Sequence, residues 1–270
     1  MQHLLLVGCG AMGGALLKGW MAANPEPFFK KVTVVTPYDL PRDLDASHVR
    51  AILPQAIDHT LLDTVDLVVF AVKPHRVKEI LPVYEAFPRM PETIFLSVAA
   101  GILLNDLATS FPGNPCVRVM PNTPSQVGEG MSVAMGNEFV RMAHKKKLTD
   151  LFARVGKILW TQKESDFHVV TALSGSGPAY VFLLGEALEK AAGELGLSRE
   201  MARALTTQML RGAGIYSSLS PETLEKLRHQ VTSPGGTTEA GLKVLLEKGD
   251  FFRLIKETLL QAATRSKELS

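Results

Sequence analysis

The stretch that decides the fold is Gly8-Cys9-Gly10-Ala11-Met12-Gly13, which matches the pattern G-x-G-x-x-G. It follows the apolar run His3–Val7 and opens a helical pattern from Ala11 to Ala23. In such a strand–loop–helix unit the first glycine makes a tight turn, the second lets the backbone approach a pyrophosphate, and the third lets helix and strand pack closely. The helix then presents free N–H groups to the anion. This context predicts a dinucleotide-binding loop, with a glycine-rich packing turn as the alternative.

Apolar runs repeat the same alternation of strand and helix as far as residue 160. Strands are predicted at His3–Val7, Val32–Thr36, Asp66–Val72, Thr93–Val98, Cys116–Met120 and, at the edge, Met131–Met135. Further helices are predicted at Arg76–Phe87, Leu103–Ser110 and Glu138–Val155. Such alternation indicates a mostly parallel sheet with right-handed crossovers.

After Thr161 the strand patterns stop and only helical patterns remain. They cover Asp166–Leu173, Pro178–Leu195, Arg199–Ser217, Pro221–Gln230, Thr237–Glu247 and Asp250–Ser266. We therefore expect an α/β Rossmann-like domain over residues 1–162 and an all-α domain over 163–270. Several of the late helices are apolar on more than one side, as in Val181–Leu184 and Leu242–Leu246. That composition predicts that the helical half buries one face against a second subunit.

Charge and cysteine content exclude several classes of protein. The 270 residues hold 29 Lys+Arg and 27 Asp+Glu, a net charge of +2, which is too balanced for a nucleic-acid-binding surface. The two cysteines, Cys9 and Cys116, are too few for a disulfide framework or a cysteine zinc site. The uncharged run Phe167–Gly185 contains glycines and a proline, so we do not expect it to span a membrane. No secretory pattern opens the chain, and a cytoplasmic location is expected.

Two groups of residues follow predicted strands at the carboxyl edge of the sheet, where ligands bind in doubly wound folds. One is Ala71-Val72-Lys73-Pro74, whose lysine points a cation toward a ligand or is a surface residue beside a helix-starting proline. The other is Ser97–Gly101, where the small residues Ala99 and Ala100 leave room for a nicotinamide ring. The next strand ends in Arg118–Pro124, in which Asn122 is either an amide partner for a ligand or a turn residue.

Two further motifs lie in the helical half. Ala172–Tyr180 reads ALSGSGPAY and joins two helices, where its glycines and serines allow close packing or the approach of a ligand. Val231–Thr238 reads VTSPGGTT and precedes a helix. Its N–H and O–H donors suit a small carboxylate, and an ordinary Pro-Gly turn with a threonine cap is the alternative.

The cofactor type depends on the end of the second strand. An NAD-specific site usually has an acid there, but this chain reads Thr36-Pro37-Tyr38, with Asp39 beyond the expected position. The missing acid favours NADPH, and Thr36 or Arg42 could meet its 2′-phosphate. NADH remains the alternative cofactor. The seven histidines show no metal-ligand spacing, so no metal site is expected.

The blocks GCGAMG, AVKP, SVAAG, RVMPNTP, ALSGSGPAY and VTSPGGTTEAGL, taken in this order, resemble pyrroline-5-carboxylate reductases. They extend from residue 8 to residue 242. The resemblance implies reduction of Δ1-pyrroline-5-carboxylate to L-proline with NAD(P)H, the last step of proline biosynthesis. It also implies a Rossmann domain followed by a helical dimerisation domain that interleaves with its partner, larger assemblies of dimers, and an active site that the partner's helical segments complete.

The resemblance also assigns site residues. Cofactor-binding residues would be Gly8, Gly10, Ala11, Met12, Gly13, Ala71, Val72, Lys73, Pro74, Ala99 and Ala100. Thr36 is added to the predicted cofactor residues from its place at the end of the second strand, not from the resemblance. Substrate-binding residues would be Glu164, Ser233, Gly235, Gly236, Thr237 and Thr238. Thr238 would hydrogen-bond the ring nitrogen and act as the catalytic residue.

Two other kinds of function compete with this reading. One is another imine or β-hydroxyacid oxidoreductase that uses NAD(P). A hydroxyacid enzyme would carry a catalytic lysine after the Rossmann half, but no lysine lies between Glu164 and Glu189. The other is a non-catalytic NAD(P)-binding sensor, which would be expected to have lost the 231–238 loop. A departure from the family pattern is Thr36-Pro37, where many members carry Asn-Arg or Ser-Arg.

Overall fold

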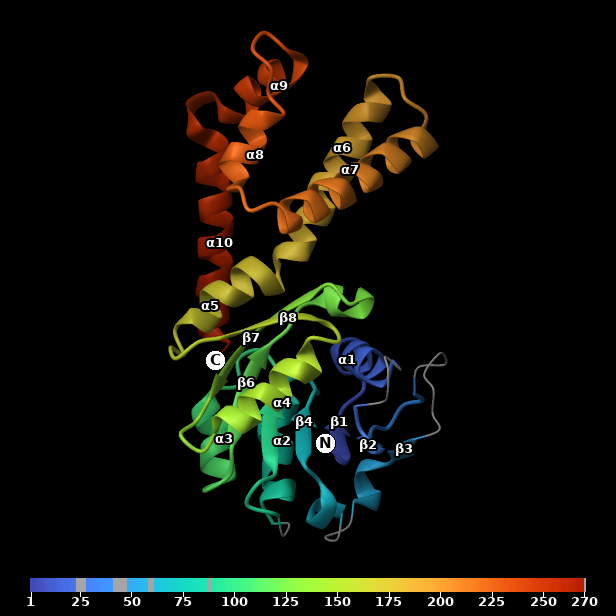
Figure 1. The fold of residues 1–270 in the computed structure, drawn as a ribbon, viewed down its shortest axis with the longest axis vertical. Coiled ribbons are helices and arrows are strands. Elements are labelled where there is room, and N and C mark those ends of the chain that lie inside the picture. Colours follow the sequence, from blue (N-terminus) through green and yellow to red (C-terminus); the bar gives the residue numbers. More distant parts are fainter. Residues whose placement is uncertain (23–27, 41–47, 58–60, 87–88, 270) are drawn as a thin grey trace. The chain divides into compact units, whose positions relative to one another are not determined.

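The computed structural model describes residues 1–22, 28–40, 48–57, 61–86 and 89–269 (Figure 1). The described chain divides into two compact units. Unit 1 comprises Met1–Ser176 and Ala262–Ser270, and unit 2 comprises Gly177–Gln261. Ala23, Arg42 and Phe87 lie outside the described residues.

Unit 1 is built on an eight-stranded sheet with the order β3-β2-β1-β4-β5-β6-β7-β8. The strands are β1 (His3–Val7), β2 (Lys31–Val35), β3 (Val49–Ile52), β4 (Leu67–Phe70), β5 (Ile94–Ser97), β6 (Cys116–Met120), β7 (Gly130–Gly136) and β8 (Gly156–Trp160). In the described chain, neighbouring strands pair in parallel except β6 with β7. The predicted mostly parallel sheet is confirmed. Strands β1 and β4 are buried on both faces, which explains their continuous apolar runs.

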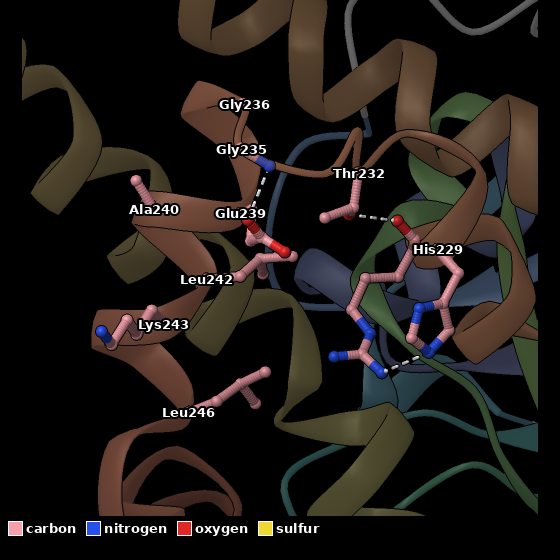
Figure 2. Close-up of a pocket in the computed structure, with 10 residues that line it drawn as sticks. His229, Thr232, Gly235, Gly236, Glu239, Ala240, Leu242, Lys243 and Leu246 are labelled. Carbon is pink, nitrogen blue, oxygen red and sulfur yellow. Dashed lines mark hydrogen bonds between the residues drawn. The ribbon is translucent and has the colours of Figure 1, made fainter.

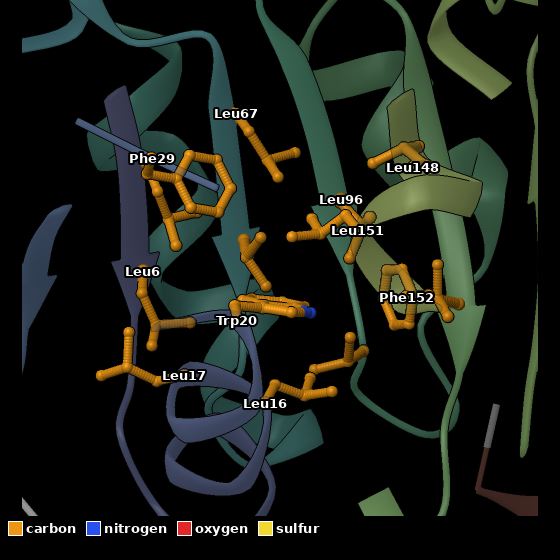
Figure 3. Packing of buried hydrophobic residues seen from close by; sticks show 14 of the residues in the cluster. Leu6, Leu16, Leu17, Trp20, Phe29, Leu67, Leu96, Leu148, Leu151 and Phe152 are labelled. Atoms are coloured by element: carbon orange, nitrogen blue, oxygen red, sulfur yellow. The ribbon is translucent and has the colours of Figure 1, made fainter. Parts of the chain in front are cut away.

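Four helices cover the two faces of this sheet: α1 (Ala11–Met21), α2 (Pro74–Glu85), α3 (Leu104–Ser110) and α4 (Met142–Phe152). Helices α1 and α4 share one buried cluster, in which the rings of Trp20 and Phe152 meet edge to face at 5.5 Å (Figure 3). Helices α2 and α3 share the cluster on the other face, around Phe70, Tyr84 and Phe111. Packing on both faces makes the sheet doubly wound and leaves the carboxyl ends of the strands for the loops that carry the motifs.

The helical part follows the sheet. It consists of α5 (Asp166–Val170), a π-helical turn (Thr171–Gly175), α6 (Gly177–Glu194), α7 (Arg199–Leu219), α8 (Leu224–Gln230), α9 (Thr237–Leu246) and α10 (Asp250–Glu268). In unit 2, α6 and α7 pack closely where a Cβ on Gly185 would lie 3.1 Å from Leu210 Cδ1. Large apolar side chains stay exposed along these helices, among them Phe182, Leu205 and Leu260.

The segment after the last strand belongs to unit 1. Asn122 Nδ2 donates to Ser174 O at 3.1 Å, and His168 Nδ1 lies 3.2 Å from Ser266 Oγ near the end of α10. The contacts therefore divide the chain after Ser176, whereas the last strand ends at Trp160. The domain limits predicted at 162 and 163 stay a prediction.

By length and composition alone, the 29-residue run Asp166–Glu194 could cross a membrane. Its most apolar 18-residue window has a mean hydropathy of 1.3, and 11% of that window is buried. The π-helical turn Thr171–Gly175 interrupts its regular α-helical geometry.

Two strands were not predicted, and predicted helices differ from the observed ones at their ends, such as Pro221–Gln230, which begins at Leu224. Strand β3 reads VRAI and is half-exposed, so its apolar pattern is weak. Strand β8 reads GKILW, in which apolar and polar residues do not alternate, and it lies beyond β7. The edge position predicted for Met131–Met135 is therefore wrong, because β8 forms the edge. The helix predicted over Glu138–Val155 is shorter, because residues 138–139 form a turn and Gly156 starts β8. Local sequence propensity alone does not locate edge strands or the ends of helices.

Buried His3 gives unit 1 a pH-dependent stability. Its ring nitrogens lie 2.9 Å from Thr33 Oγ1 and 3.1 Å from Thr64 Oγ1. Burial, with a smaller contribution from Lys31, lowers the pKa of His3 from 6.5 to about 4. The unfolded chain therefore binds one proton more than the folded chain between these values, so stability falls as pH falls through the window from 6.5 to about 4.

We expect acidification to lower the free energy of unfolding by up to roughly 3 kcal/mol through His3, at about 1.4 kcal/mol per pKa unit. The His3→Gln variant should be less stable at neutral pH but lose less on acidification. Urea unfolding of both proteins at a series of pH values measures this. Parallel pH profiles for the two would contradict it.

Candidate active site

The glycine loop lies between β1 and α1, and packing requires two of its glycines. Gly8 has a φ of +95°, and a Cβ there would lie 2.6 Å from Val72 Cγ1. A Cβ on Gly13 would lie 2.5 Å from Gly8 O and 3.1 Å from Ala71 Cβ. The loop therefore approaches the end of β4 more closely than any side chain at 8 or 13 would permit.

Gly10 differs from these two glycines, because a Cβ there would meet nothing within 4 Å. It is the N-cap of α1, which has no side-chain cap and no acid in its first turn. Its first N–H groups, including those of Ala11 and Met12, therefore have no partner within the helix and can bind an anion. This open space beside free donors fits the pyrophosphate of a dinucleotide.

The other predicted cofactor residues lie at the same edge of the sheet. Ala71 N donates to Val7 O at 2.8 Å, and Val98 N donates to Phe70 O at 3.1 Å, so the loops after β1, β4 and β5 are adjacent. The second loop holds Val72, exposed Lys73 as the N-cap of α2, and Pro74 in its first turn. The third holds buried Ala99 and half-buried Ala100. The structure thus brings together the groups predicted to line the nicotinamide end.

Thr36 lies at the end of β2, as predicted, but it is buried, and its Oγ1 accepts a hydrogen bond from Tyr38 N at 3.1 Å. The Thr36 hydroxyl thus stabilises the turn that follows β2. The second candidate for the 2′-phosphate, Arg42, is outside the described residues.

Glu164 makes an ion pair that the sequence did not indicate. One carboxylate oxygen pairs with Arg118 of β6, whose side chain is 2% exposed and whose guanidinium lies 4.2 Å from the centre of the Phe167 ring. The other oxygen accepts from Leu104 N at 3.2 Å, at the start of α3. Both oxygens are therefore engaged within unit 1, and the predicted substrate-binding role of Glu164 stays a prediction.

Asn122 connects two motifs that the sequence presents separately. Its Nδ2 donates to Ser174 O, and its Oδ1 accepts from Met131 N at 2.8 Å. The side chain is 8% exposed, so its amide serves the fold. Nearby, a Cβ on Gly175 would lie 2.7 Å from Met120 Cε, which explains the glycine in the π-helical turn. The RVMPNTP and ALSGSGPAY blocks thus meet at the end of β6.

The loop Ser233–Thr238 lies in unit 2 and leads into α9. Gly236 N donates to Ser233 O at 3.0 Å, and Gly235 has a φ of +70°. Ser233, Thr237 and Thr238 are exposed, so the hydroxyls predicted to bind substrate are accessible in the described chain. The structure gathers five of the six predicted substrate residues into this one loop.

A cavity of about 680 Å³ lies against the loop (Figure 2). It is lined by Arg228, His229, Thr232, Gly235, Gly236, Glu239, Ala240, Leu242, Lys243 and Leu246. Glu239 was not among the predicted site residues, yet its Oε2 accepts from Gly235 N at 2.8 Å. Its place in the first turn of a helix, typical of capping acids, was the available indication.

A glycine loop at the carboxyl edge of a doubly wound sheet, joined to a largely exposed apolar helical unit, defines an NAD(P)-dependent oxidoreductase with a helical dimerisation domain. Comparisons with known proteins agree with this class. Residues 164–269 match the model described as pyrroline-5-carboxylate reductase dimerisation. Residues 4–101 match the model described as NADP oxidoreductase, coenzyme F420-dependent.

Full-length relatives specify the family. The chain is 36% identical to the pyrroline-5-carboxylate reductase of Pisum sativum over 98% of this chain and 94% of the relative. It is 41% identical to that of Pseudomonas aeruginosa over 76% of this chain and 75% of the relative. Among solved structures, pyrroline carboxylate reductase of Plasmodium falciparum with NADP bound matches with a TM-score of 0.83 and 31% identity, covering 99% and 98% of the two chains. The chain belongs to the pyrroline-5-carboxylate reductase family and is an oxidoreductase of proline biosynthesis.

The contrast between Gly8 and Gly10 yields a paired prediction for cofactor binding. Gly10→Ala should fold normally, because its Cβ meets no protein atom, but it should lose NAD(P)H affinity by steric conflict with the pyrophosphate. Gly8→Ala should unfold more easily, because its Cβ meets Val72 at 2.6 Å. Thermal unfolding and titration of nicotinamide fluorescence separate the two effects. A Gly10→Ala protein with normal cofactor affinity would refute the assignment.

Glu164→Gln should destabilise unit 1, because it leaves the buried Arg118 guanidinium without its anion. A loss of about 2 kcal/mol is expected, less than for a fully buried pair because Glu164 is one-third exposed. Urea unfolding measures the loss. Ser165→Ala, next to it, serves as a control for a neutral substitution in the same segment. An unchanged urea midpoint for Glu164→Gln would show that the ion pair does not stabilise unit 1.

Proposed function

We propose that this chain reduces Δ1-pyrroline-5-carboxylate to L-proline with unit 1 binding NAD(P)H and the Ser233–Thr238 loop binding the imine. The observation that carries the proposal is the loop itself, in which backbone donors and three exposed hydroxyls gather at the start of α9. Ser233, Gly235, Gly236 and Thr237 would bind the substrate carboxylate, because a helix start offers N–H groups to an anion. Glu164 is retained as a further substrate residue.

Gly8, Gly10, Ala11, Met12 and Gly13 would hold the pyrophosphate, and residues 71–74 with Ala99 and Ala100 would line the nicotinamide end. When bound, NAD(P)H supplies the hydride. NADPH is the proposed physiological cofactor, with NADH as the alternative, since the strand end at Thr36 offers no carboxylate to repel a 2′-phosphate.

The reaction requires the protein mainly to position the imine and the hydride donor. A protonated cyclic imine is electrophilic at C5, so hydride adds there while the C=N π electrons move to nitrogen, and the iminium becomes a neutral amine. Thr238 would hydrogen-bond that nitrogen and keep its proton in place. No histidine or carboxylate with a strongly shifted pKa is needed at the nitrogen.

The helical half is the dimerisation part of the chain, and the homodimer is the unit of function. We further propose that the partner's loop completes each site, that dimers assemble into larger particles, and that the enzyme acts in the cytoplasm without binding membrane or nucleic acid. The exposed apolar residues of α6 and α7 support burial between subunits, and the π-helical turn within Asp166–Glu194 favours that over a membrane span. The near-zero net charge supports the absence of nucleic acid.

Thr238→Ala should lower turnover of the imine by about 10- to 100-fold while leaving the affinity for NADPH within about twofold, as expected for loss of one positioned hydrogen bond. Thr238→Ser, which keeps the hydroxyl, is the matched control and should retain most turnover. Steady-state kinetics with pyrroline-5-carboxylate provide the measurement. Equal turnover of the alanine variant and the wild type would remove Thr238 from the mechanism.

The first assay follows the absorbance of the reduced nicotinamide with NADPH and NADH in separate reactions. Oxidation that depends on pyrroline-5-carboxylate supports the proposed function, and the ratio of the two rates gives the cofactor preference. A folded dimer that binds cofactor but ignores this substrate would instead favour another imine or β-hydroxyacid oxidoreductase.

A further inference from the structure

The Glu239 carboxylate accepts a hydrogen bond from a backbone N–H of the proposed substrate-binding loop, Ser233–Thr238. Glu239 stands at the third position of α9, where an acid usually reaches back to the N-cap N–H. Here the N-cap is Gly236, whose N–H already donates to Ser233 O at 3.0 Å. The Glu239 carboxylate therefore reaches one residue further back, to Gly235 N at 2.8 Å (Figure 2).

This contact conflicts with substrate binding at the same loop. Gly235 has a single N–H, and the proposed function assigns that donor to the substrate carboxylate. A second carboxylate placed on the same donor would meet the Glu239 oxygen at a distance where like charges repel. Substrate and the Glu239 side chain thus compete for Gly235.

The same helix offers Glu239 another partner. Lys243 lies one turn further along α9, and both residues line the cavity beside the loop. Glutamate four residues before lysine is the favourable order for an ion pair on a helix. Within the described part of the chain Lys243 forms no ion pair, so its ammonium is available.

We propose that Glu239 is a positioning residue that holds the Gly235 N–H in the free enzyme and swings toward Lys243 when the substrate carboxylate binds. The proposal rests on the proposed function of the Ser233–Thr238 loop. It assigns Glu239 to the control of substrate affinity, since every imine molecule that binds must first displace this side chain.

The test compares full-length variants with pyrroline-5-carboxylate as substrate. Glu239→Ala frees the donor and should lower KM by about 3- to 10-fold with kcat little changed, a size typical of an exposed charged hydrogen bond. Glu239→Asp keeps the charge but is one methylene too short to reach Gly235, and it should lower KM similarly. A long-range charge effect would leave the aspartate variant at the wild-type KM and would overturn the proposal.

The Lys243→Ala variant should change KM in the opposite direction. It removes the alternative partner of Glu239 and should raise KM by about 2- to 3-fold, an effect on the scale of one helix ion pair. The same substitution in the Glu239→Ala background should leave KM unchanged, because the carboxylate with which Lys243 would pair is absent. Equal effects in both backgrounds would show that Lys243 acts on substrate directly and would overturn the proposed swing.

A purely structural role for Glu239 gives a different result. If the side chain only supports the loop, Glu239→Ala raises KM and lowers the thermal midpoint, and the proposal is overturned. Calorimetric titration of L-proline into the enzyme with NADP⁺ gives an independent readout, in which Glu239→Ala should tighten binding by the same factor. A wild-type enzyme that does not reduce the imine overturns the proposed function and this inference together, whereas an active wild type with unchanged KM in Glu239→Ala overturns the inference alone.

Discussion

The close approach of the β1–α1 loop to the end of β4 is the constraint on which the rest of the cofactor side depends. Gly8 takes a positive φ and Gly13 packs against the Gly8 carbonyl and Ala71, so the loop has no room for side chains at these positions. This approach places the start of α1 at the carboxyl edge of the sheet, where its first N–H groups can bind an anion. The pairing of β1 with β4 continues beyond the strands, where Ala71 N donates to Val7 O, so the loop after β4 lies beside the glycine loop.

A second constraint ties the segment after the last strand to the sheet. Arg118 is a buried cation, and burial of a charge is tolerated only where an anion and further hydrogen bonds compensate it. Glu164 supplies the anion and at the same time accepts from the first N–H of α3, while Phe167 covers the guanidinium. Asn122 adds neutral hydrogen bonds to the π-helical turn. The helical segment that precedes unit 2 is thereby anchored to the strand whose loop carries the RVMPNTP block.

The two units contribute different chemistry. Unit 1 offers backbone donors beside open space at Gly10, which suits a large anionic cofactor. Unit 2 offers a short loop with hydroxyls and one N–H already covered by a carboxylate. Gly235 N already donates to the Glu239 carboxylate, so this N–H can bind a carboxylate oxygen. The apolar side chains that stay exposed on α6 and α7, such as Phe182 and Leu205, explain why the chain needs a partner.

The sequence by itself determined the alternation of strands and helices, the glycine loop, the change of character near residue 161 and the family, because these depend on local patterns of apolar residues and on short motifs. It did not mark β3 or β8, since edge strands carry weak patterns. Only the tertiary structure decided which polar groups meet. Arg118 and Glu164 are 46 residues apart, and Asn122 and Ser174 are 52 apart, so their pairing follows from the path of the chain. Glu239 is only four residues from Gly235, yet their contact requires the positive φ of Gly235 and the N-cap bond of Gly236, which are properties of the folded loop.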